Sequence, residues 1–329
     1  MAPLRIGTLG AARITNQALV KPASRVDEVE ITAIAARDRG RAEAYAAKRG
    51  IPRVVDGYQA LIDDPDIDAI YNPLPNGLHG RWTIAALEAG KHVLCEKPFT
   101  ADAAEAERVA EVARRSGRVC MEAFHYRYHP LFARALEVVH GGELGEVQRI
   151  ETWMAFPLLP KGDIRWDLSL AGGTLMDVGC YAIHQNRHLA GAEPEVVSAR
   201  ALERSPGVDR FAEAELRYPD GTTGHIQVSM LSRHLLALGV RVTGRDGVLR
   251  ISNATAPQAF HRFSVRTASG RRRERFSRDA SYLHQLRAFA GAVLRDEPFP
   301  TGVDDAIANM RVIDAVYRAA GMDPRTPTA

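Results

Sequence analysis

The first third of the chain alternates short β-rich apolar runs with stretches that have helical periodicity. The runs "LRIGTLG" (4–10), "VEITAIAA" (29–36), "IDAIYNPL" (67–74) and "KHVLCEK" (91–97) are each followed by a helical pattern. Short buried strands that alternate with helices form βαβ units, and such units build a parallel sheet covered on both faces. We therefore predict a doubly wound α/β domain over residues 1–124.

After about residue 125 the pattern changes to one helix, at about 131–140, and then to a series of strands. Two connections between these strands carry Asp-Gly, at 220–221 and 246–247, a dipeptide that favours tight hairpin turns. Strands joined by tight turns indicate a mostly antiparallel sheet, so we expect residues 125–302 to form an α+β domain. The last segment, 303–329, reads as a C-terminal helix that we expect to pack back on the N-terminal domain.

The length and charge of the chain limit its partners. Its 329 residues suffice for two domains, and lysine plus arginine exceed the acids by only three (43 − 40), too few to favour nucleic acid or a membrane surface. No apolar run reaches about 18 residues, and the N-terminus lacks the features of a signal peptide. The three cysteines lack CxxC spacing, which favours reduced thiols in a cytoplasmic protein. We interpret the basic cluster "GRRRERFSR" (270–278) as a solvated hairpin tip rather than a nucleic-acid site.

The segment "IGTLGAARIT" (6–15) leaves the first strand and opens a helix, which is the context of a dinucleotide-binding fingerprint. The pattern G-x-G-x-x-G aligns with Gly10, Ala12 and Thr15, so only the first glycine is kept. Gly10 can make the tight turn, and amide groups at the helix start, around Arg13 and Ile14, would bind the phosphates. An ordinary strand-to-helix turn is the alternative interpretation.

The second strand ends in "AIAARDRGR" (33–41), where dinucleotide sites select between two cofactors. An acid at this point would hold the ribose 2′-hydroxyl of NAD, whereas an arginine fits the 2′-phosphate of NADP. Arg37 comes first and Asp38 follows it, so we favour NADP and keep NAD as the alternative.

Two further loops leave strand ends on the carboxyl side, where α/β sheets form their ligand crevice. "YNPLPNGLH" (71–79) contains two prolines and an Asn-Gly pair, and it could simply be a turn in which Asn76 caps the next helix. "CEKPFT" (95–100) follows the fourth strand and could direct Lys97 at a bound nicotinamide.

A fourth motif, "AGGTLMDVGCYAIHQNRHL" (171–189), has helical spacing. Asp177, Tyr181, His184 and His188 recur at i, i+4, i+7 and i+11, which puts them on one stripe of a helix. Each histidine alone favours a structural role, whereas Asp177 together with Tyr181 indicates a site. The histidines lack a matching ligand set, so we expect no metal.

These motifs together resemble the Gfo/Idh/MocA oxidoreductases, through "YNPLPNGLH", "GKHVLCEKP", "MEAFHYRYHP" and "GGTLMDVGCY" in this order. Within the family, the chain looks similar to the branch of NADP-dependent D-xylose dehydrogenases and dihydrodiol dehydrogenases. The resemblance implies an N-terminal Rossmann domain and a C-terminal domain with a large open sheet that is often used for dimerisation. It also suggests a cis bond between Lys97 and Pro98. Two departures are Ala36 in place of serine before Arg37, and His125 where the branch tends to have methionine.

The resemblance assigns roles residue by residue. Lys97 would be the catalytic lysine beside the nicotinamide, and Asp177 and Tyr181 would line the substrate site, with Tyr181 as proton donor or acceptor. The expected cofactor contacts are Gly10, Ala12, Arg13, Ile14, Arg37, Pro73, Leu74, Asn76, His79, Glu96 and Lys97, with Asn76 and His79 near the nicotinamide ribose. The expected substrate contacts are Arg165, Trp166, Asp177, Tyr181 and His184.

The predicted activity is reversible hydride transfer between NADP and a hydroxyl carbon of a sugar or cyclic diol. A free tyrosine has a pKa near 10, and a neighbouring ammonium would lower it, so Lys97 could activate Tyr181 or donate the proton itself. The alternatives are a reductase of 1,5-anhydrofructose or keto-deoxysugars, and a cofactor-binding regulator without turnover. We expect a homodimer formed through the C-terminal sheet.

Overall fold

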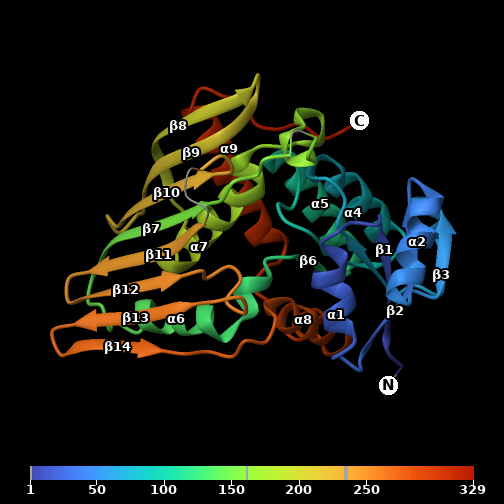
Figure 1. The fold of residues 1–329 in the computed structure, drawn as a ribbon, viewed down its shortest axis with the longest axis horizontal. Coiled ribbons are helices and arrows are strands. Elements are labelled where there is room, and N and C mark those ends of the chain that lie inside the picture. The colour runs from blue at the N-terminus through green and yellow to red at the C-terminus, as the bar shows by residue number, and fades with distance from the viewer. Residues whose placement is uncertain (1, 161, 233–235) are drawn as a thin grey trace. The chain divides into compact units, whose positions relative to one another are not determined.

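The computed structural model describes residues 2–160, 162–232 and 236–329 (Figure 1). The chain divides into two compact units. The first comprises Met1–His125 and Tyr282–Ile307, and the second comprises Tyr126–Ser281 and Ala308–Thr328. Among the described residues, no helix is both long enough and apolar enough to cross a bilayer.

The first unit is built on a six-stranded sheet in the order β3-β2-β1-β4-β5-β6, and every neighbouring pair is parallel. Its strands are β1 (Leu4–Leu9), β2 (Val29–Ala36), β3 (Arg53–Asp56), β4 (Ala69–Asn72), β5 (His92–Cys95) and β6 (Cys120–Glu122). Its helices are α1 (Lys21–Ala23), α2 (Arg39–Arg49), α3 (Tyr58–Ile62), α4 (His79–Glu88), α5 (Ala103–Ser116) and most of α8 (Ser281–Arg295). The predicted doubly wound fold is confirmed, and its strand order reverses between β1 and β4.

The second unit is built on an eight-stranded sheet in the order β14-β13-β12-β11-β7-β10-β9-β8, in which only β7 and β10 pair in parallel. Its strands are β7 (Val147–Ala155), β8 (Glu195–Ser205), β9 (Val208–Arg217), β10 (Thr223–Ser229), β11 (Ala237–Gly244), β12 (Gly247–Ser252), β13 (Arg262–Thr267) and β14 (Gly270–Glu274). Its helices are α6 (Pro130–His140), α7 (Cys180–Ala190) and the greater part of α9 (Val303–Ala319). The mostly antiparallel sheet and both Asp-Gly hairpins are confirmed.

The basic cluster at 270–278 is not a hairpin tip. The turn lies earlier, because Thr267 pairs with Gly270 across the two strands, and the arginines that follow form the edge strand β14. The start of α9 belongs to the first unit, where Asp304 forms an ion pair with Arg114 of α5.

Helices α6 and α7 cover one face of the eight-stranded sheet (Figure 1). The Asn186 amide of α7 anchors this helix, since its Nδ2 donates to the carbonyl oxygen of Ile150 at 3.1 Å and its Oδ1 accepts from the Tyr218 hydroxyl at 2.8 Å. The Thr152 hydroxyl adds a bond to the carbonyl oxygen of Ala182 at 2.9 Å. Buried polar groups that are fully paired fix a helix in one position, so the residues on α7 have a rigid base.

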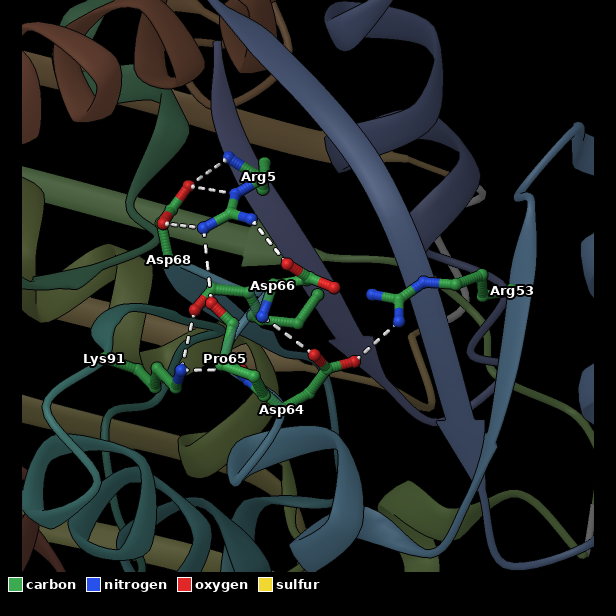
Figure 2. A network of polar contacts seen from close by, with 8 residues as sticks. Arg5, Arg53, Asp64, Pro65, Asp66, Asp68 and Lys91 are labelled. Atoms are coloured by element: carbon green, nitrogen blue, oxygen red, sulfur yellow. Dashed lines mark hydrogen bonds and ion pairs between the residues drawn. The ribbon is translucent and has the colours of Figure 1, made fainter. Parts of the chain in front are cut away.

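The amino-terminal edge of the parallel sheet is closed by a polar network (Figure 2). The Arg5 guanidinium at the start of β1 binds both carboxylate oxygens of Asp68, at 3.0 and 2.8 Å. The Lys91 ammonium, which precedes β5, donates to the carbonyl oxygens of Asp64 and Ile67, each at 2.7 Å. The network therefore ties the loop before β4 to the strands on both of its sides.

Candidate active site

The turn after β1 has the shape that a dinucleotide requires. Gly10 has φ +78°, which favours glycine, and a Cβ there would lie 3.1 Å from a methyl carbon of Leu74. The loops after β1 and β4 thus meet where the strand order reverses. Ala12 and Ile14 are half-buried and Arg13 is exposed, immediately before the helical segment that contains Asn16–Val20. Thr15 is buried at the position of the missing third glycine. These residues fit a bound dinucleotide phosphate.

The end of β2 separates the two candidate ribose-binding side chains. Arg37 is exposed directly after the strand. Asp38 caps helix α2, because its side chain accepts a hydrogen bond from the backbone N–H of Arg41 at 2.9 Å. One oxygen of the carboxylate that could have selected NAD is therefore already engaged by the protein.

The loop after β4 is fixed by an asparagine that the sequence analysis did not single out. Asn72 is completely buried, and its Nδ2 donates to the carbonyl oxygen of His79 and to the Thr83 hydroxyl, each at 3.1 Å. The sequence feature that could have identified Asn72 is a polar asparagine at the end of an otherwise apolar strand. Pro73 and Leu74 are buried beyond it, and Asn76 is half-buried at the start of a 3-10 turn, Asn76–Leu78, that leads into α4.

His79, the first residue of α4, is 1% exposed. Its Nδ1 lies 2.8 Å from the carbonyl oxygen of Pro98, and its Nε2 lies 2.6 Å from the carbonyl oxygen of Leu74. Burial, assisted by the positive charge of Lys97, lowers the pKa of His79 to about 4. Both ring nitrogens therefore face the protein backbone, and a contact with the ribose remains a prediction.

The loop after β5 presents one accessible side chain among buried ones. Within residues 96–100, only Lys97 is not buried. The carboxylate of Glu96 accepts a hydrogen bond from the Tyr71 hydroxyl at 2.8 Å, and burial holds the pKa of that phenol well above its usual value. The bond between Lys97 and Pro98 is cis, as the resemblance implied. The acid and the proline thus anchor the turn, and Lys97 is its one half-buried residue.

In the second unit, Asp177 is part of an ion-pair chain. The Arg165 guanidinium lies 2.9 Å from an oxygen of Asp177 and 3.1 Å from an oxygen of Asp163, and the charge of Asp177 raises the pKa of Arg165. Asp163 also caps the turn Ile164–Trp166 by accepting from the backbone N–H of Arg165. Arg165 and Asp177 were predicted, whereas Asp163 was missed because no periodic pattern connects it to them.

The predicted continuous helical stripe was wrong at its start. Asp177 lies in a π-helical turn, Leu175–Gly179, and the α-helix proper begins at Cys180. A π turn bonds i to i+5 and breaks the spacing of 3.6 residues, so Asp177 and Tyr181 are not successive positions of one regular helix. Asp177 is instead placed by its ion pair.

The remaining residues of the predicted stripe, Tyr181, His184 and His188, lie close to other aromatic or imidazole rings. The Tyr126 hydroxyl bonds Nδ1 of His184, and the Tyr126 ring lies 6.0 Å, between centroids, from that of Tyr181. His184 is completely buried and its ring is 4.2 Å from that of His188. Tyr126 was not predicted, although it belongs to the "MEAFHYRYHP" motif.

Trp166 is 8% exposed, and the Arg204 guanidinium lies 4.3 Å from the centre of its ring. One face of the indole is therefore covered by the protein's own cation. Asp163 and Trp166 line a pocket of about 340 Å³ that continues to Val208 on β9. This pocket belongs wholly to the second unit.

Comparison with known proteins assigns this geometry to a family. Residues 4–124 match the oxidoreductase family with an NAD-binding Rossmann fold, and residues 132–250 match the GFO/IDH/MocA C-terminal domain. The D-xylose 1-dehydrogenase (NADP(+)) 2 of Haloferax volcanii is 39% identical over 321 residues, which are 96% of this chain and 97% of the relative. The chain belongs to the Gfo/Idh/MocA family.

Other members support this assignment. The trans-1,2-dihydrobenzene-1,2-diol dehydrogenase of Mus musculus is 33% identical over 258 residues, 77% of this chain and 76% of the relative. The crystal structure of a 3-ketoreductase from Actinomadura kijaniata, in complex with NADP and TDP-benzene, has a TM-score of 0.90 and 32% identity, and covers 99% of this chain and 100% of that chain. The Gfo/Idh/MocA chain described here is thus an NAD(P)-dependent oxidoreductase.

Proposed function

We propose that this oxidoreductase transfers a hydride reversibly between NADP and a hydroxyl or carbonyl carbon of a sugar or cyclic diol. The observation that carries the proposal is the turn after β5, in which Lys97 is the one residue of 96–100 that is not buried. The names of its relatives, a D-xylose dehydrogenase, a dihydrodiol dehydrogenase and a 3-ketoreductase, agree with this chemistry.

The choice of NADP rests on the end of β2. Arg37 is exposed there and can pair with a 2′-phosphate, while Asp38 is engaged as the cap of α2. The relative from Haloferax volcanii is named for NADP, and the ketoreductase structure contains it.

In the proposed mechanism the bound nicotinamide supplies or accepts the hydride. The protein has to position the polyol and move one proton. Tyr181 would hold that proton at its phenol oxygen, and the Lys97 ammonium would lower the pKa of the phenol by favouring the phenolate, or donate the proton itself. Asp177, oriented by Arg165, would hydrogen-bond a substrate hydroxyl. Trp166 and His184 would complete the substrate site, together with Arg165.

The same residues could work in the direction of reduction. A 3-ketoreductase from Actinomadura kijaniata shares this fold at a TM-score of 0.90, and a relative from that organism is named a 3-reductase of a dTDP-linked dideoxysugar. A keto-deoxysugar or 1,5-anhydrofructose is therefore the second candidate substrate. The two directions differ in the substrate offered and leave the residue roles unchanged.

The experiment is a panel of aldoses, vicinal diols and ketosugars assayed with NADP(H) and with NAD(H). We expect turnover with at least one polyol or ketosugar, and a higher kcat/KM with NADP(H). Tight binding of NADPH without turnover on any member would contradict the proposal and favour a regulator.

We also propose a homodimer formed through the outer face of the eight-stranded sheet. A two-fold axis between β11 and β7, parallel to the strands, would lay β9 of one copy over β13 of the other. Glu213 and Glu215 point outward on β9, each also paired with an arginine of its own sheet, and Arg262 and Arg266 point outward on β13. Opposite charges would therefore face each other. The double variant Arg262→Glu/Arg266→Glu should elute as a monomer in gel filtration, and a monomeric wild type would contradict the dimer.

We propose that the protein is cytoplasmic and that its three segments have the roles expected from the sequence. All three cysteines are buried and none is in a disulfide, which fits a reducing compartment. Residues 1–124 would bind the cofactor, residues 125–302 would bind substrate and dimerise, and 303–329 would return to the N-terminal domain.

A further inference from the structure

We propose that His79 is a positioning residue, which bridges the loop after β4 to the loop after β5 and thereby sets the place of the Lys97 amine. The inference rests on the proposed function in one respect, namely that Lys97 acts beside the nicotinamide. It assigns His79 to the support of the site rather than to direct contact with the cofactor.

The ring of His79 faces two backbone carbonyl groups, one in each of the two loops. One belongs to Pro98, the residue directly after Lys97, at 2.8 Å from Nδ1, and the other belongs to Leu74, two residues before Asn76, at 2.6 Å from Nε2. The ring is completely enclosed, at 1% exposure. A single side chain therefore spans two loops whose contacted residues, Leu74 and Pro98, are 24 positions apart in the sequence (98 − 74).

The chemistry of the ring makes this contact specific. A neutral imidazole has one N–H and can donate to only one carbonyl at a time, whereas an imidazolium donates to both. Burial and the nearby positive charge of Lys97 disfavour the imidazolium. At neutral pH the ring therefore donates its one N–H to one of the two carbonyl groups, and replacing it with an aliphatic side chain leaves that buried carbonyl without its donor.

The base of the bridge is rigid. The carbonyl oxygen of His79 accepts from the Asn72 amide at 3.1 Å, so the ring starts from a fixed point of the backbone. The next residue, Gly80, lies so close to α5 that a Cβ there would be 2.3 Å from the Glu105 side chain. The carboxylate of Glu105 in turn accepts from the backbone N–H of Ala101 at 2.9 Å.

The loop that carries Lys97 is consequently held on both sides of the lysine. Before it, the backbone N–H of Glu96 donates to the carbonyl oxygen of Asn72 at 3.0 Å. After it, the His79 ring faces Pro98, and Glu105 holds Ala101. If the ring is removed, the loop loses the contact that His79 makes at Pro98, and the backbone that carries the Lys97 amine is expected to shift.

The test compares His79→Leu, which removes both ring nitrogens, with His79→Gln, which keeps one donor. Misplacement of a reacting group by about 1 Å can cost about 10²-fold in rate. We expect His79→Leu to lower kcat by about 10-fold to 100-fold while the Kd of NADPH, measured by fluorescence, changes by less than about threefold, because the proposed phosphate contacts, at the turn after β1 and at Arg37, lie elsewhere. His79→Gln should recover part of kcat.

The matched control is His92→Leu. His92 is a second histidine of the same sheet, its Nδ1 accepts from the backbone N–H of Val119 at 3.0 Å, and it lies at the other end of β5. This variant should lose thermal stability and keep kcat within about twofold. A His79→Leu enzyme whose kcat is as little affected as that of His92→Leu would overturn the proposal. If His79→Leu does not fold, the same criterion applies to His79→Met, which also lacks both ring nitrogens.

A readout without turnover separates this inference from the proposed function. In protein labelled with ε-¹³C-lysine, the Lys97 cross-peak, assigned by its loss in Lys97→Met, should move in His79→Leu and stay in place in His92→Leu. An unmoved peak would exclude the bridge even if the enzyme is active. A moved peak in a protein that turns over no polyol would keep the bridge and reject the proposed function.

Discussion

Two lysines, Lys91 and Lys97, lie at opposite ends of strand β5 and differ in their burial and contacts. Lys91, before the strand, is 9% exposed, and its ammonium is bound by two backbone carbonyl groups at 2.7 Å. Lys97, after the strand, is half-buried in a turn whose other residues are buried. The first lysine completes the fold of the amino-terminal edge (Figure 2), and the second is displayed by the fold of the carboxyl-terminal edge.

The difference shows how one sheet separates stability from chemistry. At the amino-terminal edge the charges are matched within the protein, as in the Arg5–Asp68 pair, where the hydrogen bond from Arg5 holds the pKa of Asp68 below its usual range. At the carboxyl-terminal edge the buried polar groups, such as Asn72 and His79, hold loops in place. Substitutions at the first edge should therefore act on folding, and substitutions at the second should act on turnover.

The largest expected effect is on kcat, and it tests whether Tyr181, which lies in the second unit, takes part in the reaction. Tyr181→Phe removes the proposed proton donor, so kcat should fall by about 10³-fold while the Kd of NADPH stays near that of the wild type. Tyr218→Phe is the matched control, because Tyr218 is a buried tyrosine that bonds only the structural residue Asn186 among the contacts described above. It should lower the melting temperature and retain kcat. A Tyr181→Phe enzyme of nearly normal rate would remove the phenol from the mechanism.

A smaller effect concerns the pH dependence of stability at the carboxyl-terminal edge. The pKa of His79 is about 4 in the folded protein and near 6.5 when unfolded, so the unfolded state binds the extra proton between these values. Stability should therefore be lost as the pH falls from 6.5 to 4, by about 3 kcal/mol from this group. In urea titrations at pH 7 and pH 4, His79→Gln should lack that contribution. Equal pH slopes for both proteins would refute the assignment.

The next effect sharpens the cofactor choice. Arg37→Ala should weaken NADP binding by about 30-fold, since one charge-assisted hydrogen-bonded pair is lost, and should change NAD binding little. Arg39→Ala is the control, because the Arg39 guanidinium already pairs with Glu43 at 2.8 Å and with Asp56. Equal losses for NADP and NAD in Arg37→Ala would contradict the phosphate contact.

Much of the fold follows from local sequence patterns. The β-rich runs and the helices between them predicted the parallel sheet, and the two Asp-Gly turns predicted the antiparallel one. The strands β13 and β14 were missed because their arginines, at Arg262, Arg266 and 271–273, hide the alternation of buried and exposed positions that marks a strand. Charged residues on an edge strand protect it from pairing with other chains. They also remove the alternation of apolar and polar residues by which a strand is recognised in a sequence.

The candidate site was predictable in its motifs and not in its internal contacts. Residues such as Lys97 and Arg37 stand at strand ends that the pattern identifies. The ion pair of Arg165 with Asp177 and the bridge made by His79 depend on contacts between distant segments, which a single sequence does not reveal. The π turn at Leu175–Gly179 also replaced the regular spacing from which the stripe was inferred.

The most direct test of the account is the same substitution at both ends of β5, with turnover and unfolding free energy measured on each variant. Lys97→Met should abolish turnover while NADPH affinity and stability stay close to the wild type. Lys91→Met should keep kcat/KM and lose about 2 kcal/mol of stability, because two buried carbonyl groups lose their charged donor. Comparable turnover in Lys97→Met, or loss of turnover in a folded Lys91→Met protein, would contradict the division between the two edges.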